Sequence, residues 1–140
     1  MRAKRTLGQL LKMLCVLFVL FLVYAFYQFI HAPFTGAEFN RASWLANARS
    51  AEQWYEYRVE TRDHCPRGAM YSDLEHNYLT VGKRKADIVT LLGEPDFIPN
   101  QKEYCIAYWL GFCSGFRIDL DSLNICFKEG RMAEVYHAQH

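Results

Sequence analysis

An uncharged stretch near the start of the chain constrains this sequence more than any other feature. Residues 13–30 (MLCVLFVLFLVYAFYQFI) contain no charged side chain, and Gln28 is their only strongly polar residue. As a helix, these 18 residues with the preceding Leu10 and Leu11 would cross about 30 Å of hydrocarbon. A buried helix this apolar on every side needs a larger protein around it than 140 residues provide. We therefore expect a transmembrane anchor over 13–30.

Two other targeting sequences are the alternatives to an uncleaved signal-anchor. A cleaved signal peptide has an apolar core of only about 7–15 residues, and here Pro33 directly follows the weak cleavage site Ile30-His31-Ala32. A lipoprotein signal needs small and apolar residues before its cysteine, whereas Cys15 follows Lys12-Met13-Leu14. Both comparisons favour the uncleaved anchor.

The charge distribution predicts the orientation of this anchor. Four basic residues and no acidic residue precede it, whereas only Glu38 and Arg41 follow closely. The positive-inside rule places the basic tail 1–12 in the cytoplasm and residues 31–140 across the membrane. From His31 onward, 12 basic residues stand against 15 acidic ones, although the whole chain carries +1. This balance offers no basic excess for phosphates, so we expect no nucleic-acid partner.

The first part of the translocated region, 31–64, is expected to form a juxtamembrane linker followed by a helix. Pro33 and Gly36 fall in 31–42, which favours irregular structure there. The helix begins at Ser43 as N-cap and places apolar side chains on one face at helical spacing. These are Trp44, Ala48, Ala51 and Tyr55.

The remaining residues, 65–140, predict a small α+β domain. Pro66 suits the first turn of a helix over about 67–78, and a second helix is expected over 85–92. Aromatic content and alternation predict strands over 104–110, 123–128 and 132–137, with Phe116 and Ile118 as an optional extension. Glu129-Gly130 forms a tight turn between the last two strands. The fold class is therefore α+β, with helices packed on a three-stranded antiparallel sheet after an N-terminal transmembrane helix.

Four of the five cysteines lie in the translocated part, where an oxidising compartment favours disulfides. Cys105 and Cys126 fall on strands expected to be adjacent, which would leave Cys65 for Cys113, although sequence alone allows three connectivities. Cys15 lies inside the anchor. Zinc is the alternative, with His64, His76, His137 and His140 as further ligands, but no C-x-x-C pair is present. We expect no metal and no cofactor.

The segment 79–95 (LTVGKRKADIVTLLGEP) resembles the SmpA/OmlA (BamE-like) family of small bacterial envelope proteins. The shared frame contains Gly82, Ile88, Leu91, Leu92, Gly93 and Pro95. Upstream, Arg67-x-x-Met70-x-x-Asp73-Leu74 fits the family pattern, as do Tyr108 to Gly111, Leu123-x-Ile125-x-Phe127 and Gly130 downstream. The resemblance covers about residues 67–136, in the family's order. Arg84 departs from it, because many relatives carry Ser or Thr there, and a membrane span replaces the family's lipobox.

The resemblance implies two helices on a three-stranded antiparallel sheet, a fold related in shape to β-lactamase-inhibitor proteins. It also implies binding of envelope proteins, and contact with anionic lipid, rather than catalysis. With the predicted orientation, it places the chain in a bacterial inner membrane, with the C-terminal domain in the periplasm. An accessory role in envelope assembly or maintenance is the function expected.

The residues themselves supply few candidate sites. The basic run Lys83-Arg84-Lys85 is either a solvated face or a contact for lipid headgroups or an acidic partner. Tyr108 and Trp109 would be partner contacts if the sheet leaves them exposed. Asp119 and Asp121 could be paired carboxylates, and a Cys/His nucleophile pair could act if the thiols were reduced. Neither indicates an enzyme, so an inhibitor or ligand-sensing module is the second hypothesis and a thiol-dependent enzyme the third.

Overall fold

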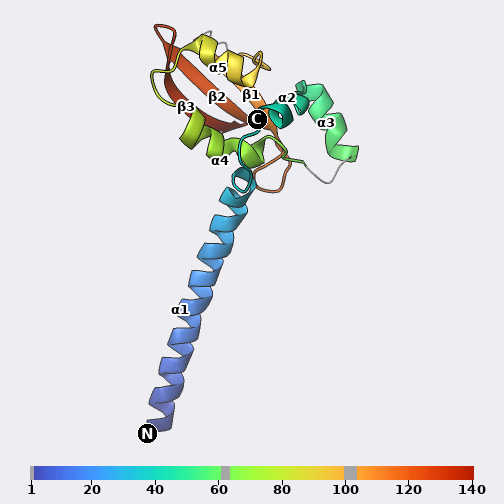
Figure 1. Cartoon of the computed structure of the whole chain (residues 1–140). Helices are drawn as coiled ribbons and strands as arrows, with labels where there is room; N and C mark the ends of the chain where they lie inside the picture. Colours follow the sequence, from blue (N-terminus) through green and yellow to red (C-terminus); the bar gives the residue numbers. More distant parts are fainter. Residues whose placement is uncertain (1, 61–63, 100–103) are drawn as a thin grey trace. The chain divides into compact units, whose positions relative to one another are not determined.

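The chain divides into two compact units, Met1–Ala32 and Pro33–His140, in a computed structural model that describes residues 2–60, 64–99 and 104–140 (Figure 1). The first unit is the helix α1 (Arg2–His31). A candidate span, Gly8–Phe34, begins in this helix and ends just beyond it; it has a mean hydropathy of 2.4 and is long enough to cross a membrane. The anchor predicted over 13–30 lies inside this helix.

The second unit is built on a three-stranded antiparallel sheet in the order β1-β2-β3. The strands are β1 (Cys105–Gly111), β2 (Asp121–Lys128) and β3 (Arg131–Gln139), close to the predicted ranges. Glu129 and Gly130 both adopt positive φ, at 53° and 73°, as a two-residue hairpin turn requires. The mixed α+β class is therefore confirmed.

The helical segment after Pro66 and the helix that follows it cover one face of this sheet. A continuous helical segment follows Pro66, formed by the 3-10 turn η2 (Gly68–Met70), α4 (Tyr71–Asp73) and the π-helical turn η3 (Leu74–Tyr78). The helix α5 (Lys85–Leu92) follows. Alternate strand residues point toward these helices and form the main core with them, among them Ile106, Tyr108, Leu123 and Ile125. Both predicted helices are confirmed.

The motif around α5 is structural. Ile88 and Leu92 are fully buried, and Leu91 packs against the same core from a half-buried position. Gly93 caps the helix with φ of 86°, a conformation that glycine adopts without strain. Gly82 has φ of 89°, and the chain leaves α5 toward the sheet through Pro95. Within the described residues, Arg84 at the N-cap makes no side-chain capping bond.

The helix predicted from Ser43 is two helices, α2 (Arg41–Ala46) and α3 (Ala51–Glu60), and its N-cap is Asn40. The Asn40 side chain accepts the Ser43 amide at 2.9 Å. A capping box separates the two helices, because Ser50 and Gln53 exchange side-chain-to-backbone bonds at 2.9 and 3.3 Å. The break rotates α3, so Trp54 is buried and the predicted inward residues Ala48 and Tyr55 are exposed.

The segment 31–64 is also more than a linker and a helix. The compact unit begins at Pro33, and Trp44 lies fully buried in its main core. Trp54 joins a second cluster with Trp109, Phe112 and Leu120 on the other face of the sheet. Both hydrophobic clusters thus include a tryptophan from the segment 33–60. The compact domain therefore begins before residue 65, at Pro33.

A buried ion pair joins these layers. Arg67 is 1% exposed and donates to Asp96 at 2.7 Å, to the Trp44 carbonyl at 2.8 Å and to the Trp109 carbonyl at 3.2 Å. Burial lowers the pKa of Arg67 and raises the pKa of Asp96, because desolvation outweighs their mutual attraction. The one guanidinium thus joins the Trp44 carbonyl, the Asp96 carboxylate and the Trp109 carbonyl.

Two disulfides pair the four cysteines of the domain as the strand arrangement suggested. Cys105–Cys126 joins partners in the β1–β2 register, and Cys65–Cys113 joins the start of the helical segment to the end of β1. Gly68 packs directly on the second bridge, where a Cβ atom would overlap both sulfur atoms. Cys15 is the free cysteine of the described residues, on α1. Disulfides indicate an oxidising compartment.

Candidate functional site

Backbone pairing brings the basic run 83–85 beside the β2–β3 turn. The Gly82 amide donates to Met132 and the Met132 amide donates to Lys83, both at 2.8 Å, while the Lys85 amide donates to Gly130 at 3.0 Å. Arg84 and Arg131 form an antiparallel bridge. The run that precedes α5 therefore lies against β3, some 45 residues later in the chain.

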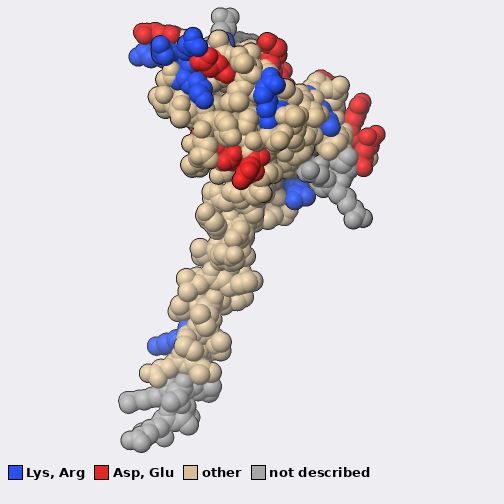
Figure 2. All heavy atoms as spheres, in the orientation of Figure 1, with Lys and Arg blue, Asp and Glu red and all other residues tan. Residues whose placement is uncertain are grey.

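Five basic side chains gather at this end of the sheet, and we call them the basic patch. They are Lys83, Arg84, Lys85, Lys128 and Arg131. Figure 2 shows Lys and Arg side chains collected over the end of the domain that carries the β2–β3 turn. Two acidic residues lie among them, Asp87 and Glu129, which leaves a formal charge of +3.

The contacts of the basic patch orient its side chains without neutralising it. Arg84 pairs with Asp87 at 2.8 Å, and this bond raises the pKa of Arg84 and lowers that of Asp87. Lys83 donates to the Tyr78 carbonyl, and Arg131 donates to the Gly82 carbonyl at 3.1 Å. Carbonyl oxygens leave the cationic charge in place. The patch therefore presents a partly fixed cationic surface.

Tyr108 and Trp109 do not contribute to a partner surface. Tyr108 is fully buried and donates to the Gly93 carbonyl at 2.9 Å, and burial raises its pKa. Trp109 is 8% exposed because Phe97 stacks on it with ring centroids 4.1 Å apart. This corrects their assignment as contact candidates, since residues of this same chain cover both faces of the sheet here.

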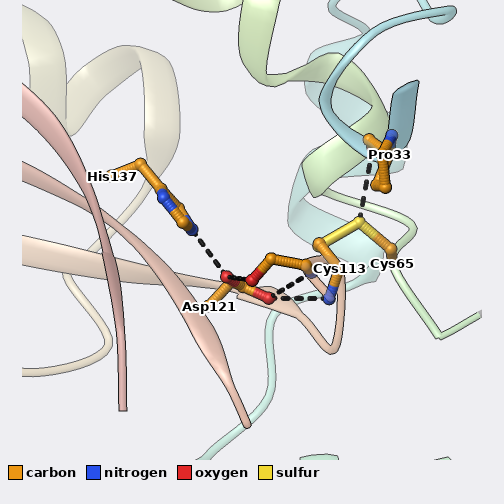
Figure 3. Close-up of a disulfide and its surroundings, with 6 residues drawn as sticks. Pro33, Cys65, Cys113, Asp121 and His137 are labelled. Carbon is orange, nitrogen blue, oxygen red and sulfur yellow. Dashed lines mark hydrogen bonds and ion pairs between the residues drawn. A yellow bond between two sulfur atoms is a disulfide. The ribbon is translucent and has the colours of Figure 1, made fainter. Parts of the chain in front are cut away.

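A second polar cluster surrounds Asp121 at the opposite end of β2 (Figure 3). The buried carboxylate accepts from His137 at 2.6 Å, from the Cys113 and Ser114 amides at 2.7 and 2.9 Å, and from the Ser114 hydroxyl. Burial alone would raise the pKa of Asp121, but these hydrogen bonds outweigh it and lower the pKa. The carboxylate fixes the loop that follows β1.

This cluster has the composition of a serine triad without its connectivity. In a triad the imidazole accepts the serine proton, whereas Ser114 donates to the carboxylate itself. Asp119 is exposed and Asp121 is buried, which does not support the alternative that the two form paired carboxylates. The role that the geometry supports for Asp121 is structural.

The predicted zinc alternative finds no geometric support in 2–60, 64–99 and 104–140, where no three His, Cys, Asp or Glu side chains cluster as metal ligands. His76 contacts the Ser72 carbonyl at 2.7 Å, and His140 contacts the Ser122 hydroxyl at 2.8 Å. The four cysteines of the domain are disulfide-bonded. Burial lowers the pKa of His140.

Sequence reasoning identified three of the five residues of the basic patch and missed Lys128 and Arg131. These two flank the predicted turn Glu129-Gly130, and a hairpin places the flanks of its turn side by side, so the signal was present. Comparison with family models, with curated proteins and with solved structures finds no match to this chain.

Proposed function

We propose that this chain is a non-catalytic protein-interaction module, anchored in a bacterial inner membrane, whose folded domain binds an acidic envelope protein in the periplasm. Its role is that of an accessory in envelope assembly or maintenance. The single observation that carries the proposal is the basic patch, assembled from two distant segments on a domain closed by two disulfides.

The location and orientation of the anchor are supported by charge. Four basic residues and no acidic residue precede the uncharged segment 13–30, which favours a cytoplasmic N-terminus. The disulfides fit a domain on the opposite, oxidising side. The resemblance of 79–95 to the SmpA/OmlA family supports an envelope protein of this kind.

The position of the basic patch within the domain favours an acidic protein over the anchoring membrane. The chain enters the domain at Pro33, and Phe34 packs on His137 with ring centroids 4.7 Å apart. Arg131 lies six residues back along β3 from His137, or roughly 20 Å at the rise of a strand. That separation exceeds the Debye length of about 8 Å at physiological salt. The patch is therefore distant from the point of membrane attachment.

Affinity isolation of the full chain from crosslinked membranes tests the proposal. The variant Lys128→Glu/Arg131→Glu reverses two charges and leaves the Arg84–Asp87 pair unchanged, while Lys128→Arg/Arg131→Lys conserves charge as the matched control. We expect a reproducible acidic partner that the control retains and the reversal loses. Equal recovery with both variants, or no reproducible partner, would contradict the proposal. A reporter fused to each terminus checks the orientation.

A further inference from the structure

We propose that the loop between β1 and β2, at Phe116-Arg117-Ile118, inserts into the lipid interface of the membrane that α1 spans, as a second membrane contact of the domain. The inference depends on the membrane anchor of the proposed function but not on its protein partner. Phe116 is 84% exposed and Ile118 is 58% exposed. Phe112 of the same domain is 0% exposed, so these two apolar side chains, one residue apart, stand out from the covered core.

This apolar loop lies at the end of the domain where the chain enters. The Cys65 sulfur lies 3.5 Å from the Pro33 carbonyl oxygen, and Cys65 is bridged to Cys113 (Figure 3). Phe116 is three residues beyond Cys113, which an extended chain covers in about 10 Å. Pro33 lies near the end of the candidate span and is the first residue of the compact domain, so the loop lies close to the point where the chain enters the domain.

The loop is held in shape by contacts at both of its ends. The Ser114 amide donates to the Asp121 carboxylate at 2.9 Å, and the Arg117 amide donates to the Ser114 carbonyl at 3.0 Å. Arg117 adopts positive φ of 58° at the tip. From α3, Arg58 donates to the Ile118 carbonyl at 3.1 Å. A preorganised loop loses little conformational freedom when it inserts.

The chemistry of the loop matches a lipid interface better than a protein groove. Phenyl and branched aliphatic groups insert at the boundary of headgroups and acyl chains, where flanking guanidinium groups meet phosphates. Arg117 lies between the two apolar residues and Arg58 donates to the Ile118 carbonyl, so both can supply these cations. The exposed Asp119 follows directly and limits the depth of insertion to the interface.

Tryptophan quenching by brominated lipid tests this contact in the full chain. Phe116→Trp and, as the matched control, Val81→Trp are reconstituted in vesicles of phosphatidylcholine and phosphatidylglycerol, with or without bromine near the top of one acyl chain. Val81 is 78% exposed and precedes the basic patch at the other end of the sheet. The native Trp44, Trp54 and Trp109 are 0%, 0% and 8% exposed, so they contribute a constant background.

We expect the added emission of Phe116→Trp to be blue-shifted and reduced by about half in brominated vesicles, because the ring lies in the headgroup and acyl boundary. Val81→Trp should emit as in water and stay unquenched. Water-like, unquenched emission from both variants would overturn the proposal, as would equal quenching of both or failure of the chain to enter vesicles. Disulfide content by thiol titration confirms that each variant is folded. A second probe, Ile118→Cys labelled with bimane in a Cys15→Ser background, must give the same result.

The outcome is separable from that of the proposed function. The charge reversal Lys128→Glu/Arg131→Glu should abolish capture of an acidic partner and leave the quenching of Phe116→Trp unchanged. Quenching that falls with this reversal would overturn the loop as the contact, because the basic patch would then hold the domain on the lipid.

Discussion

Replacement of Arg67 by methionine tests the reasoning about the buried ion pair most directly. Methionine retains much of the side-chain length but removes every donor, so among the described residues Asp96 keeps the Trp109 amide, at 2.8 Å, as its hydrogen-bond donor. Two buried carbonyls, of Trp44 and Trp109, lose their guanidinium donor as well. Removing one partner of a buried pair costs about 3–5 kcal/mol, a large part of the roughly 5–15 kcal/mol typical of a domain.

Urea denaturation of the full chain in detergent micelles, followed by tryptophan fluorescence, measures this loss. With an m value of about 1–2 kcal/mol/M, Arg67→Met should lower the midpoint by at least about 1.5 M. Arg84→Met is the matched control, because it breaks the exposed pair with Asp87 and should leave the midpoint unchanged within error.

The pH dependence follows from the same pair. Burial already raises the pKa of Asp96, and loss of the Arg67 charge should raise it further. A carboxyl whose folded-state pKa lies above its unfolded value binds its proton more readily in the folded state, so acidification favours folding. The loss of unfolding free energy in Arg67→Met, relative to wild type, should therefore become smaller as the pH falls from about 7 toward about 5.

A double-mutant cycle supplies the refutation. Because Asp96→Asn removes the charge that Arg67→Met leaves uncompensated, the double variant should lose less than the sum of the two single losses by about 1–3 kcal/mol. Additive losses, or a midpoint for Arg67→Met no lower than that of Arg84→Met, would refute the assignment of the stability to this pair.

Two further perturbations have defined outcomes. Gly68→Ala should destabilise the domain by about 1–3 kcal/mol through overlap with the disulfide sulfurs, and urea midpoints should show no such penalty in a Cys65→Ala/Cys113→Ala background; an equal penalty there would contradict the steric argument. Asp121→Asn should cost about 1–3 kcal/mol near neutral pH. Since the pKa of Asp121 is lowered by its donors, its stabilisation is present above its unfolded value of about 4 and lost as the pH falls below it. Stability curves of wild type and Asp121→Asn should therefore converge in acid, and a constant gap would contradict the linkage.

The helices and strands that were predicted correctly have regular hydrophobic periodicity and residues that end an element, such as glycine and proline. The helix over 85–92 combines inward aliphatic residues with Gly93 and Pro95, and it has the same bounds in the structure. The alternation of Leu123, Ile125 and Phe127 located β2 and the face that it buries. These signals lie within short stretches of the sequence, so they can be identified without knowledge of tertiary contacts.

The predictions that were wrong concern helix faces and side-chain burial that tertiary contacts determine. The side chains of Ala48 and Ala51 are too small to define a helical face. The capping box Ser50-Ala51-Glu52-Gln53 marks the break before α3, and this motif can be identified in the sequence. The burial of Trp109 depends on Phe97 and Trp54 reaching the second face of the sheet. Phe116 and Ile118 do not extend a strand, because the positive φ of Arg117 turns the chain there.

In the basic patch, too, the residues that are neighbours in sequence could be predicted, and those joined only by the fold could not. The run Lys83-Arg84-Lys85 could be identified from sequence because its residues are contiguous, whereas Lys128 and Arg131 join it only through the pairing of 82–85 with 130–132. Arg67 was seen only as part of a family pattern. Composition alone favours an exposed arginine, and its burial depends on three partners brought together by the fold.

The two disulfides interleave along the chain, and this has a consequence for oxidative folding. A chain that is oxidised from its N-terminus onward would first join Cys65 to Cys105 and then Cys113 to Cys126, and neither bond is native. Native pairing requires either that β1 and β2 associate before their thiols are oxidised or that thiol–disulfide exchange repairs the early bonds. Production of this domain therefore depends on a disulfide isomerase, or on refolding under reducing conditions before oxidation, rather than on an oxidant alone.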